Sequence, residues 1–417
     1  MMLPRKTPDI RHQIKNLSSQ SPLPERRDWS CPLMADSPIP YVFGGFGAVI
    51  FNGNIIVSDL GNCNIPINDI SFIGTKIGIN KIMKLFIITF LSFYMLLLFG
   101  CGTSKEAIPD YVWPPPPEKA RIKFVNIIKG KDYFESSGID KVLSVLAGEH
   151  TGTTFERPYA VAVDATGNIY VSDTSLKKVF VFDVTQKQIR TIGDKGSAKL
   201  QSPIGIAIAS SNKIFIADSK VRRVFAYDLE GNLLFGIGEE NEFASPTGLA
   251  FDSSSSRLYV VDTNNHLVRV YNDEGKFLFT FGKRGGDDGE FNFPTNITVH
   301  KGKVYVVDTI NGRVQIFDLE GKFVSKFGQL GNTPGYFSRP KGIALDSFGH
   351  IYIVDAAFDN FQLFNEKGEA LMFIGQAGAG IAEFQLPAGI FIDKDNYIYV
   401  VDQLNARVQV FQFIGKE

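Results

Sequence analysis

The stretch that decides the fold is residues 246–282, PTGLAFDSSSSRLYVVDTNNHLVRVYNDEGKFLFTFG. Its apolar residues alternate with a period of two rather than 3.6, which is typical of strands and not of helices. Clusters of Ser, Asn, Asp and Gly interrupt the apolar runs and mark turns. The stretch predicts four strands: Thr247–Asp252, Arg257–Asp262, Val268–Tyr271 and Phe277–Phe281.

Residues 246–282 are one of six copies of the same pattern. Each copy reads Pro-x-Gly-apolar-Ala-apolar-Asp and then Gly-x-apolar-Tyr-Val-x-Asp, with substitutions. The copies begin at prolines spaced 43 to 48 residues apart: Pro158, Pro203, Pro246, Pro294, Pro340 and Pro387. Four antiparallel strands in about 45 residues are one blade of a propeller. The sequence therefore predicts an all-β fold, a six-bladed β-propeller of four-stranded antiparallel blades.

The closure of the ring can be predicted from the two ends of the repeat region. The sixth copy has three strands and the sequence ends at Glu417, so its fourth strand is missing. A strand-like run, Arg121–Ile128, precedes the first copy, and we expect it to complete the last blade. This N-terminal strand would remove exposed strand edges, which otherwise invite aggregation. The propeller is predicted to span residues 120–417.

The first strand of each copy alternates small with large residues, as Leu249 and Ala250 do. Successive side chains of a strand point to opposite faces of the sheet. We therefore expect a small face of one blade to receive the large residues of the next.

Two segments resemble the NHL repeat. They are Asp308-Thr309-Ile310-Asn311-Gly312-Arg313-Val314 and Asp402-Gln403-Leu404-Asn405-Ala406-Arg407-Val408. The resemblance covers residues ~120–417 and implies the six-bladed fold. We expect the repeated Asp and Arg to pair across the hairpin in a structural role, as a partly exposed pair that contributes little stability.

One apolar run, Leu85–Gly100, follows Lys81 and Lys84. As a helix, its length is about 24 Å, shorter than the ~30 Å hydrocarbon core of a membrane. A basic flank before a short apolar core is typical of a secretory signal peptide, predicted here as residues 83–100. Leu98–Cys101 resembles a bacterial lipobox, which implies lipidation of Cys101. A plain transmembrane anchor is the alternative.

The remaining N-terminal segments follow from that interpretation. Residues 1–82 are expected to be a non-native or disordered extension, either disordered in the mature protein or absent from it, because a signal peptide begins at the N-terminus. Residues 101–119 are expected to form a tether that carries the lipidated cysteine and ends in a proline-rich spacer. Gly102 is not the aspartate that retains lipoproteins at the inner membrane. The predicted address is therefore extracytoplasmic, on the outer membrane facing the periplasm if the organism has two membranes.

The net charge and the counts of cysteine and histidine argue against nucleic-acid binding and against a metal site. The net charge is −1, and from Cys101 onward 34 Lys and Arg residues stand against 38 Asp and Glu residues, which argues against nucleic acid as a partner. The three cysteines, Cys31, Cys63 and Cys101, do not have metal-ligand spacing. His150, His266, His300 and His350 fall in different structural layers, so we expect surface histidines rather than ligands, no metal site and no cofactor.

Departures from the repeat at the start of the inner strands predict a site at one mouth of the channel. Such side chains could bind a peptide, an acidic ligand or a sugar. We expect a monomeric binding or scaffolding module that uses a protein, peptide or small ligand as partner and a lipid anchor in the membrane. The resemblance also implies an alternative, a propeller hydrolase or lyase, lactonase-like or metal-dependent, with its site at the central channel. The candidate binding residues are Arg157, Tyr159, Thr247, Thr295, Asn296, Arg339 and Lys341.

Overall fold

The computed structural model describes residues 48–51, 54–57, 111–130, 133–134, 155–196, 199–209 and 212–415. The chain divides into two compact units, Met1–Gly100 and Cys101–Glu417. In the first unit, β1 (Ala48–Phe51) pairs with β2 (Asn54–Val57) as an antiparallel hairpin, within the extension that we expected to be disordered. The predicted signal peptide and Cys101 lie outside the described residues.

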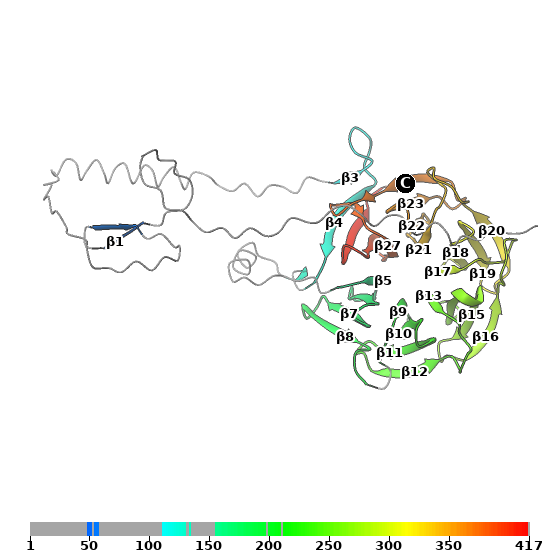
Figure 1. Ribbon diagram of the computed structural model, residues 1–417. Coiled ribbons are helices and arrows are strands. Elements are labelled where there is room, and N and C mark those ends of the chain that lie inside the picture. Colours follow the sequence, from blue (N-terminus) through cyan, green and yellow to red (C-terminus); the bar gives the residue numbers. More distant parts are fainter. Residues whose placement is uncertain are drawn as a thin grey trace, which may run out of the picture. The chain divides into compact units, whose positions relative to one another are not determined.

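The second unit is a ring of six antiparallel sheets (Figure 1). The predicted all-β, six-bladed propeller is confirmed. The strands of blades 1 to 3 are, in order, β5 (Pro158–Val163), β6 (Ile169–Asp173), β7 (Lys178–Asp183) and β8 (Gln188–Ile192); β9 (Pro203–Ile208), β10 (Lys213–Asp218), β11 (Arg223–Asp228) and β12 (Leu233–Ile237); and β13 (Pro246–Asp252), β14 (Arg257–Asp262), β15 (Leu267–Asn272) and β16 (Phe277–Phe281).

Blades 4 and 5 have the same strand order as blades 1 to 3. Blade 6 contains strands from both the beginning and the end of the second unit. Two short elements lie between these strands: η2 (Thr263–Asn265), a 3₁₀ helix in the turn between β14 and β15, and the parallel pair β25 (Gln376–Ala377) and β26 (Glu383–Phe384), which connects blades 5 and 6. The strands of blades 4 to 6 are β17 (Pro294–His300), β18 (Lys303–Asp308), β19 (Arg313–Asp318) and β20 (Phe323–Phe327); β21 (Pro340–Leu345), β22 (Ile351–Asp355), β23 (Asn360–Phe364) and β24 (Ala370–Ile374); and β27 (Pro387–Ile392), β28 (Tyr397–Asp402), β29 (Arg407–Phe413), β4 (Ile122–Ile128) and β3 (Val112–Trp113).

Blade 6 joins the two ends of the repeat region. β4 pairs antiparallel with β29 and takes the place of the missing fourth strand, with Ile128 opposite Val408. β3 then adds a fifth strand along the outer edge of β4. The Trp113 ring packs edge-on against Phe411, with ring centroids 5.7 Å apart. The end of the segment expected to be a tether is therefore part of the sheet.

Burial differs from strand to strand within a blade because only the middle strands are covered on both faces. In blade 5, every residue of β22 is buried, whereas β24 exposes Ala370, Leu371 and other outward residues. The second strand of each copy accordingly has a nearly continuous apolar run. The fourth strand of blades 1 to 5 buries only its last residue, which is Ile192, Ile237, Phe281, Phe327 or Ile374.

The hydrophobic core consists of six clusters, each made by two neighbouring blades. Between blades 3 and 4, for example, Ala250 of the inner strand packs with the larger Ile297 of the next inner strand. The small Ala250 side chain leaves room for the larger Ile297 side chain. This contact confirms the prediction that a small face of one blade receives the large residues of the next. Each cluster closes one interface, so no face of a blade is left without a partner blade.

The repeated aspartate at the end of the second strand is fully buried and joins the hairpin to the inner strand. In blade 4, Asp308 Oδ1 accepts the backbone N–H of Asn292 at 2.6 Å, and Arg313 Nε donates to Asp308 Oδ2 at 2.8 Å. Blade 6 repeats the ion pair with Asp402 and Arg407, at 2.7 Å. The predicted pairing is confirmed, but the prediction that it is partly exposed was wrong, because the connection from the preceding blade covers both groups.

A matched pair of glycine substitutions tests how closely the blades approach. A Cβ at Gly205 would lie 2.1 Å from the carbonyl oxygen of Thr247 in the next blade, whereas a Cβ at the exposed Gly286 would meet nothing within 4 Å. Neither residue has a positive φ. We expect Gly205→Ala to lower the free energy of unfolding by about 1–3 kcal/mol, the usual cost of overpacking. Urea denaturation followed by circular dichroism measures this; equal midpoints for Gly205→Ala and Gly286→Ala would contradict close blade packing.

Candidate functional site

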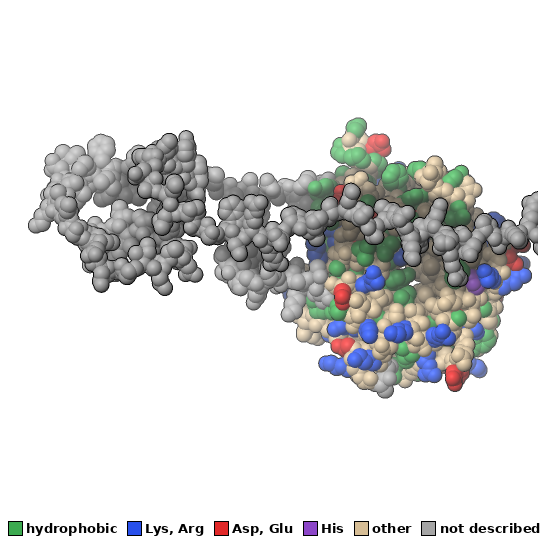
Figure 2. Space-filling view, viewed as in Figure 1, with side chains coloured by type: hydrophobic (Ala, Val, Ile, Leu, Met, Phe, Trp, Pro, Cys, Tyr) green, Lys and Arg blue, Asp and Glu red, His purple; other side chains and the backbone are tan. Residues whose placement is uncertain are grey.

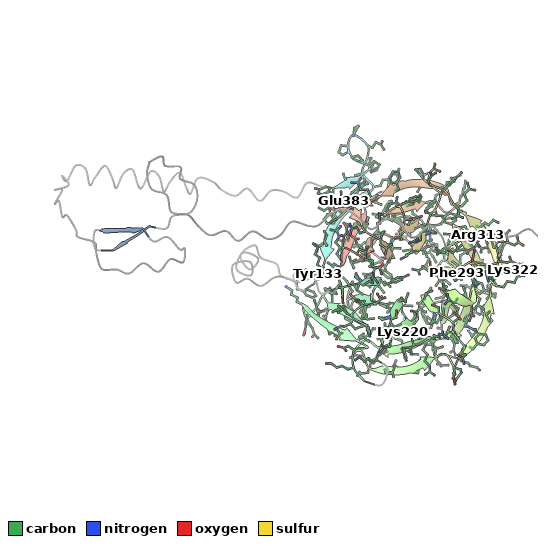
Figure 3. The ribbon with its side chains drawn as sticks, in the orientation of Figure 1. Tyr133, Lys220, Phe293, Arg313, Lys322 and Glu383 are labelled. Carbon is green, nitrogen blue, oxygen red and sulfur yellow. The ribbon has the colours of Figure 1, made fainter. Side chains whose placement is uncertain are left out.

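The inner strands β5, β9, β13, β17, β21 and β27 contact one another in sequence around the ring. Because the blades are equivalent, the first residues of these strands encircle the same end of the channel, which we call the channel mouth. Figure 3 shows Phe293, just before β17, on the side of blade 4 that faces the channel, and Lys322 at its outer edge.

Four predicted residues come together at the channel mouth: Arg157, Tyr159, Arg339 and Lys341, here called the mouth cluster. Lys341 Nζ lies 5.4 Å from the centroid of the Tyr159 ring, a cation–π contact between blades 5 and 1. Burial lowers the pKa of Lys341, and the positive charges of Arg339 and Arg157 lower it further. Burial raises the pKa of the Tyr159 hydroxyl.

The two arginines are positioned by their backbones. The N–H of Arg157 donates to Asp173 Oδ2 at 3.0 Å, and the N–H of Arg339 donates to Asp355 Oδ1 at 3.0 Å. Both carboxylates are fully buried. The arginine residues themselves are exposed, and neither they nor Lys341 form a salt bridge with any acidic side chain that the structure describes.

The predicted threonines lie at the same mouth but bond within the propeller. Thr247 Oγ1 lies 2.7 Å from Thr263 Oγ1 and 3.1 Å from the carbonyl oxygen of Thr295 in the next blade. Thr295 Oγ1 lies 2.7 Å from Thr309 Oγ1. These hydroxyls connect the inner strands of neighbouring blades, so the structure gives them a role in holding the ring.

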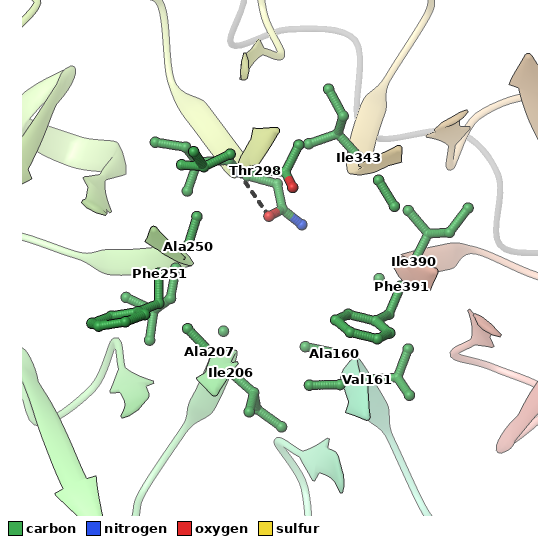
Figure 4. A pocket seen from close by; sticks show the side chains of 18 of the residues that line it. Ala160, Val161, Ile206, Ala207, Ala250, Phe251, Thr298, Ile343, Ile390 and Phe391 are labelled. Atoms are coloured by element: carbon green, nitrogen blue, oxygen red, sulfur yellow. Dashed lines mark hydrogen bonds between the residues drawn. The ribbon is translucent and has the colours of Figure 1, made fainter. Parts of the chain in front are cut away.

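Inside the ring, the inner strands enclose a cavity of about 290 Å³, shown in Figure 4. Its lining is apolar except for three side chains, which all come from β17: Asn296, Thr298 and His300, here called the polar wall. Of the predicted binding residues, only Asn296 lines this cavity. Thr298 was missed, although the sequence does show Thr there where four other copies have alanine.

The groups of the polar wall have capacity for further hydrogen bonds. Asn296 Oδ1 accepts the N–H of Ile297 at 2.8 Å, the dashed line in Figure 4, and this leaves the amide Nδ2 of Asn296 unbonded among the described residues. The hydroxyl of Thr298 likewise bonds to no group in the described part of the chain. His300 Nε2 is buried without a hydrogen-bond partner there.

The other histidines do not match the prediction of surface positions. His266 is buried, and its Nδ1 accepts the N–H of Phe293 at 3.1 Å, so it supports the channel mouth from the preceding blade. His350 is half-buried, and its Nδ1 lies 2.8 Å from the buried carboxylate of Asp346. His150 lies outside the described residues. The described part of the chain contains no group of three or more His, Cys, Asp or Glu side chains arranged to hold a metal ion.

Two family models match this chain. Residues 243–271 match the NHL repeat, and residues 286–363 and 349–416 match a family described as a 6-bladed beta-propeller. The protein is therefore a six-bladed β-propeller with NHL-type repeats, as its blades and repeated Asp and Arg residues also show. No curated protein matches the sequence.

Similar folds occur among solved structures. A structural genomics protein of unknown function from Bacteroides thetaiotaomicron has a TM-score of 0.51 at 16% identity, over 62% of this chain and 70% of that chain. Virginiamycin B lyase from Staphylococcus aureus has a TM-score of 0.47 at 14% identity, over 62% and 80%. A gluconolactonase from Xanthomonas campestris has 0.49 at 12%, over 62% and 86%. At 16% identity, the first of these supports the fold alone.

The titration of His300 gives a test of its surroundings. Burial and the charge of Lys301 lower its pKa below the ordinary 6.5, while Asp346 and Glu366 act weakly in the opposite direction. The unfolded chain therefore binds a proton at higher pH than the folded one, so the free energy of unfolding falls as pH drops from 6.5 to the folded pKa. We expect an NMR titration of the imidazole to give a pKa under 6.5. In His300→Asn this part of the pH dependence should vanish; an unchanged dependence would contradict the assignment.

Proposed function

We propose that this protein is a binding module that holds an anionic ligand at the channel mouth. The observation that carries the proposal is the mouth cluster, in which Arg157, Arg339 and Lys341 lie close enough for the arginines to lower the pKa of the lysine. An anion placed among them would offset both their mutual repulsion and the burial of Lys341.

The geometry favours carboxylate or phosphate groups. Guanidinium groups bind both in a bidentate manner, and Lys341 adds a single positive charge above the aromatic ring of Tyr159. The cations come from blades 1 and 5, which flank blade 6, where Ala388 is small and buried. A ligand bound to all three would therefore span blade 6. An acidic peptide or a small acid has this chemistry.

The charge of the molecule also bears on the partner. Figure 2 shows Lys and Arg side chains spread over the face in view, with fewer Asp and Glu side chains. The basic residues are not interleaved with stacked aromatic side chains, as a nucleic-acid surface would require. For the alternative hydrolase or lyase, none of the described residues that line the cavity has a carboxylate to act as acid, base or metal ligand.

We further propose that a lipid on Cys101 anchors the protein outside the cytoplasm, on the outer membrane facing the periplasm where there are two membranes. Support comes from the short apolar run before Cys101, from the lysines that precede this run, and from the resemblance of Leu98–Cys101 to a lipobox. Among the described residues, no helix is long and apolar enough to cross a membrane. A monomeric propeller held at the surface would present its channel mouth to soluble partners.

Anion binding is tested with a fluorescein-labelled hexaglutamate peptide and with inorganic phosphate as a competitor. We expect Arg157→Ala, Arg339→Ala and Lys341→Ala each to weaken peptide binding by about 10- to 100-fold, since a hydrogen bond to a charged group contributes about 1.5–3 kcal/mol. Added salt should weaken binding to the wild type.

Lys322→Ala is the matched control for these substitutions, because Lys322 lies in the turn between β19 and β20 at the outer edge of blade 4. It should leave the dissociation constant within twofold of the wild type. Fluorescence anisotropy measures all of these affinities. Equal losses in Lys322→Ala and Lys341→Ala would show that only net charge matters and would overturn the site.

Lipidation is tested by growing cells that express the full chain with an alkyne-bearing fatty acid. The wild type should incorporate the label and fractionate with membranes, and Cys101→Ser should lose both properties, because acylation requires the thiol of that cysteine. Cys63→Ser is the matched control, since Cys63 precedes the apolar run. Undiminished labelling of Cys101→Ser would refute the anchor.

A further inference from the structure

The cavity within the ring is separate from the mouth cluster. The cavity is not lined by any residue of the mouth cluster. The described residues that line it include no Asp, Glu, Lys or Arg. The two places therefore present different chemistry: several cations at the mouth, and a cavity whose lining side chains are uncharged and, apart from the polar wall, apolar.

The polar wall is a departure of a single blade from the repeat. Asn296, Thr298 and His300 are alternate residues of β17, so their side chains leave the strand on the same side. The other inner strands have small or apolar residues at the first two positions. They are Ala160 and Ala162, Gly205 and Ala207, Gly248 and Ala250, Gly342 and Ala344, and Gly389 and Phe391.

At the position of His300, four other blades have an aspartate that bonds within its own hairpin. Asp346, for example, accepts hydrogen bonds from the N–H groups of Phe348 and His350 and from the hydroxyl of Tyr352. None of these aspartates lines the cavity. His300 does line it, and its Nε2 is buried with no partner in the described chain. The usual structural role of this position is therefore absent in blade 4.

A buried polar group without a hydrogen bond costs about 1–3 kcal/mol. On this wall, His300 Nε2 is such a group, and the half-buried Asn296 and Thr298 add an amide Nδ2 and a hydroxyl with no partner among the described residues, so the wall is unfavourable for an apolar occupant alone. The opposite sides, with Ile206, Phe251 and Phe391, equally disfavour a charged one, because desolvating a lone carboxylate costs far more.

We propose that this cavity binds a neutral, largely apolar small molecule that carries carbonyl or hydroxyl groups along one side. Those groups bond to Asn296, Thr298 and His300, and the rest of the molecule contacts the apolar inner strands. The cavity volume of about 290 Å³ is close to the lower end of ligand pockets, so the occupant is compact. This site is independent of anion binding at the mouth.

The test uses saturation-transfer NMR on the full chain with benzamide and benzyl alcohol as neutral polar probes. Toluene serves as the apolar probe and benzoate as the charged one. We expect benzamide and benzyl alcohol to bind the wild type, and Thr298→Val, which keeps the shape and removes the hydroxyl, to weaken both by about 3- to 10-fold, since a net hydrogen bond contributes about 0.5–1.5 kcal/mol. Toluene should bind Thr298→Val at least as well as the wild type.

Two further variants complete the design. Thr280→Val, at an exposed position of β16, is the matched control and should leave every affinity unchanged. Asn296→Gly gives blade 4 the residue that four other blades have, so it should fold and still lose benzamide affinity. The proposal is overturned if benzamide does not bind the wild type, if it binds Thr298→Val and Asn296→Gly equally well, or if benzoate binds as tightly as benzamide. Hexaglutamate binding, measured in parallel, should be unaffected by either cavity variant.

Discussion

The structure depends on contact between neighbouring blades, because a single blade cannot cover its own two apolar faces. Each of the six core clusters draws on two sheets, and residues such as Tyr259 and Phe361 are fully buried only through that contact. Burial of a large side chain contributes about 1.5–3 kcal/mol, so each interface holds many such contributions. An open arrangement would leave two faces in water. β4 closes the ring for this reason, and its position beside β29 also protects the edge of the last blade.

Most of this architecture could be predicted from the sequence, since the contacts repeat. Three features recur in all six copies: alternation with a period of two, a proline at the start of the inner strand, and an aspartate at the end of the second strand. A substitution in one copy therefore does not hide the pattern, because the other copies show it. β3 could not be predicted in this way. Val112–Trp113 are too short for a period, and they form a strand because the free edge of β4 and the ring of Phe411 are available in the folded blade.

The candidate site was predictable in part, for a related reason. Arg157 and Arg339 stood out just before the repeat proline and Lys341 just after it, and the ring brings them to the same mouth. Thr247 and Thr295 stood out equally, yet their hydroxyls bond to the neighbouring inner strands, which only the three-dimensional register reveals. His266 was wrongly placed on the surface because its partner, the N–H of Phe293, belongs to the next blade. Thr298 gave a weak signal, as threonine is common in strands.

Repetition in the fold makes departures from it informative about function. The positions that form the interfaces between blades are mostly apolar in every copy in this chain, whereas the polar wall belongs to blade 4 alone and the cations of the mouth cluster to blades 1 and 5. Asn296 and Thr298 replace the small residues of other blades and add polar atoms without disrupting the cluster around Ile343 and Val307. Chemistry can therefore vary along the channel while the packing that closes the ring stays the same. A cationic mouth beside an apolar cavity is a direct consequence, because each inner strand contributes to both places through different residues.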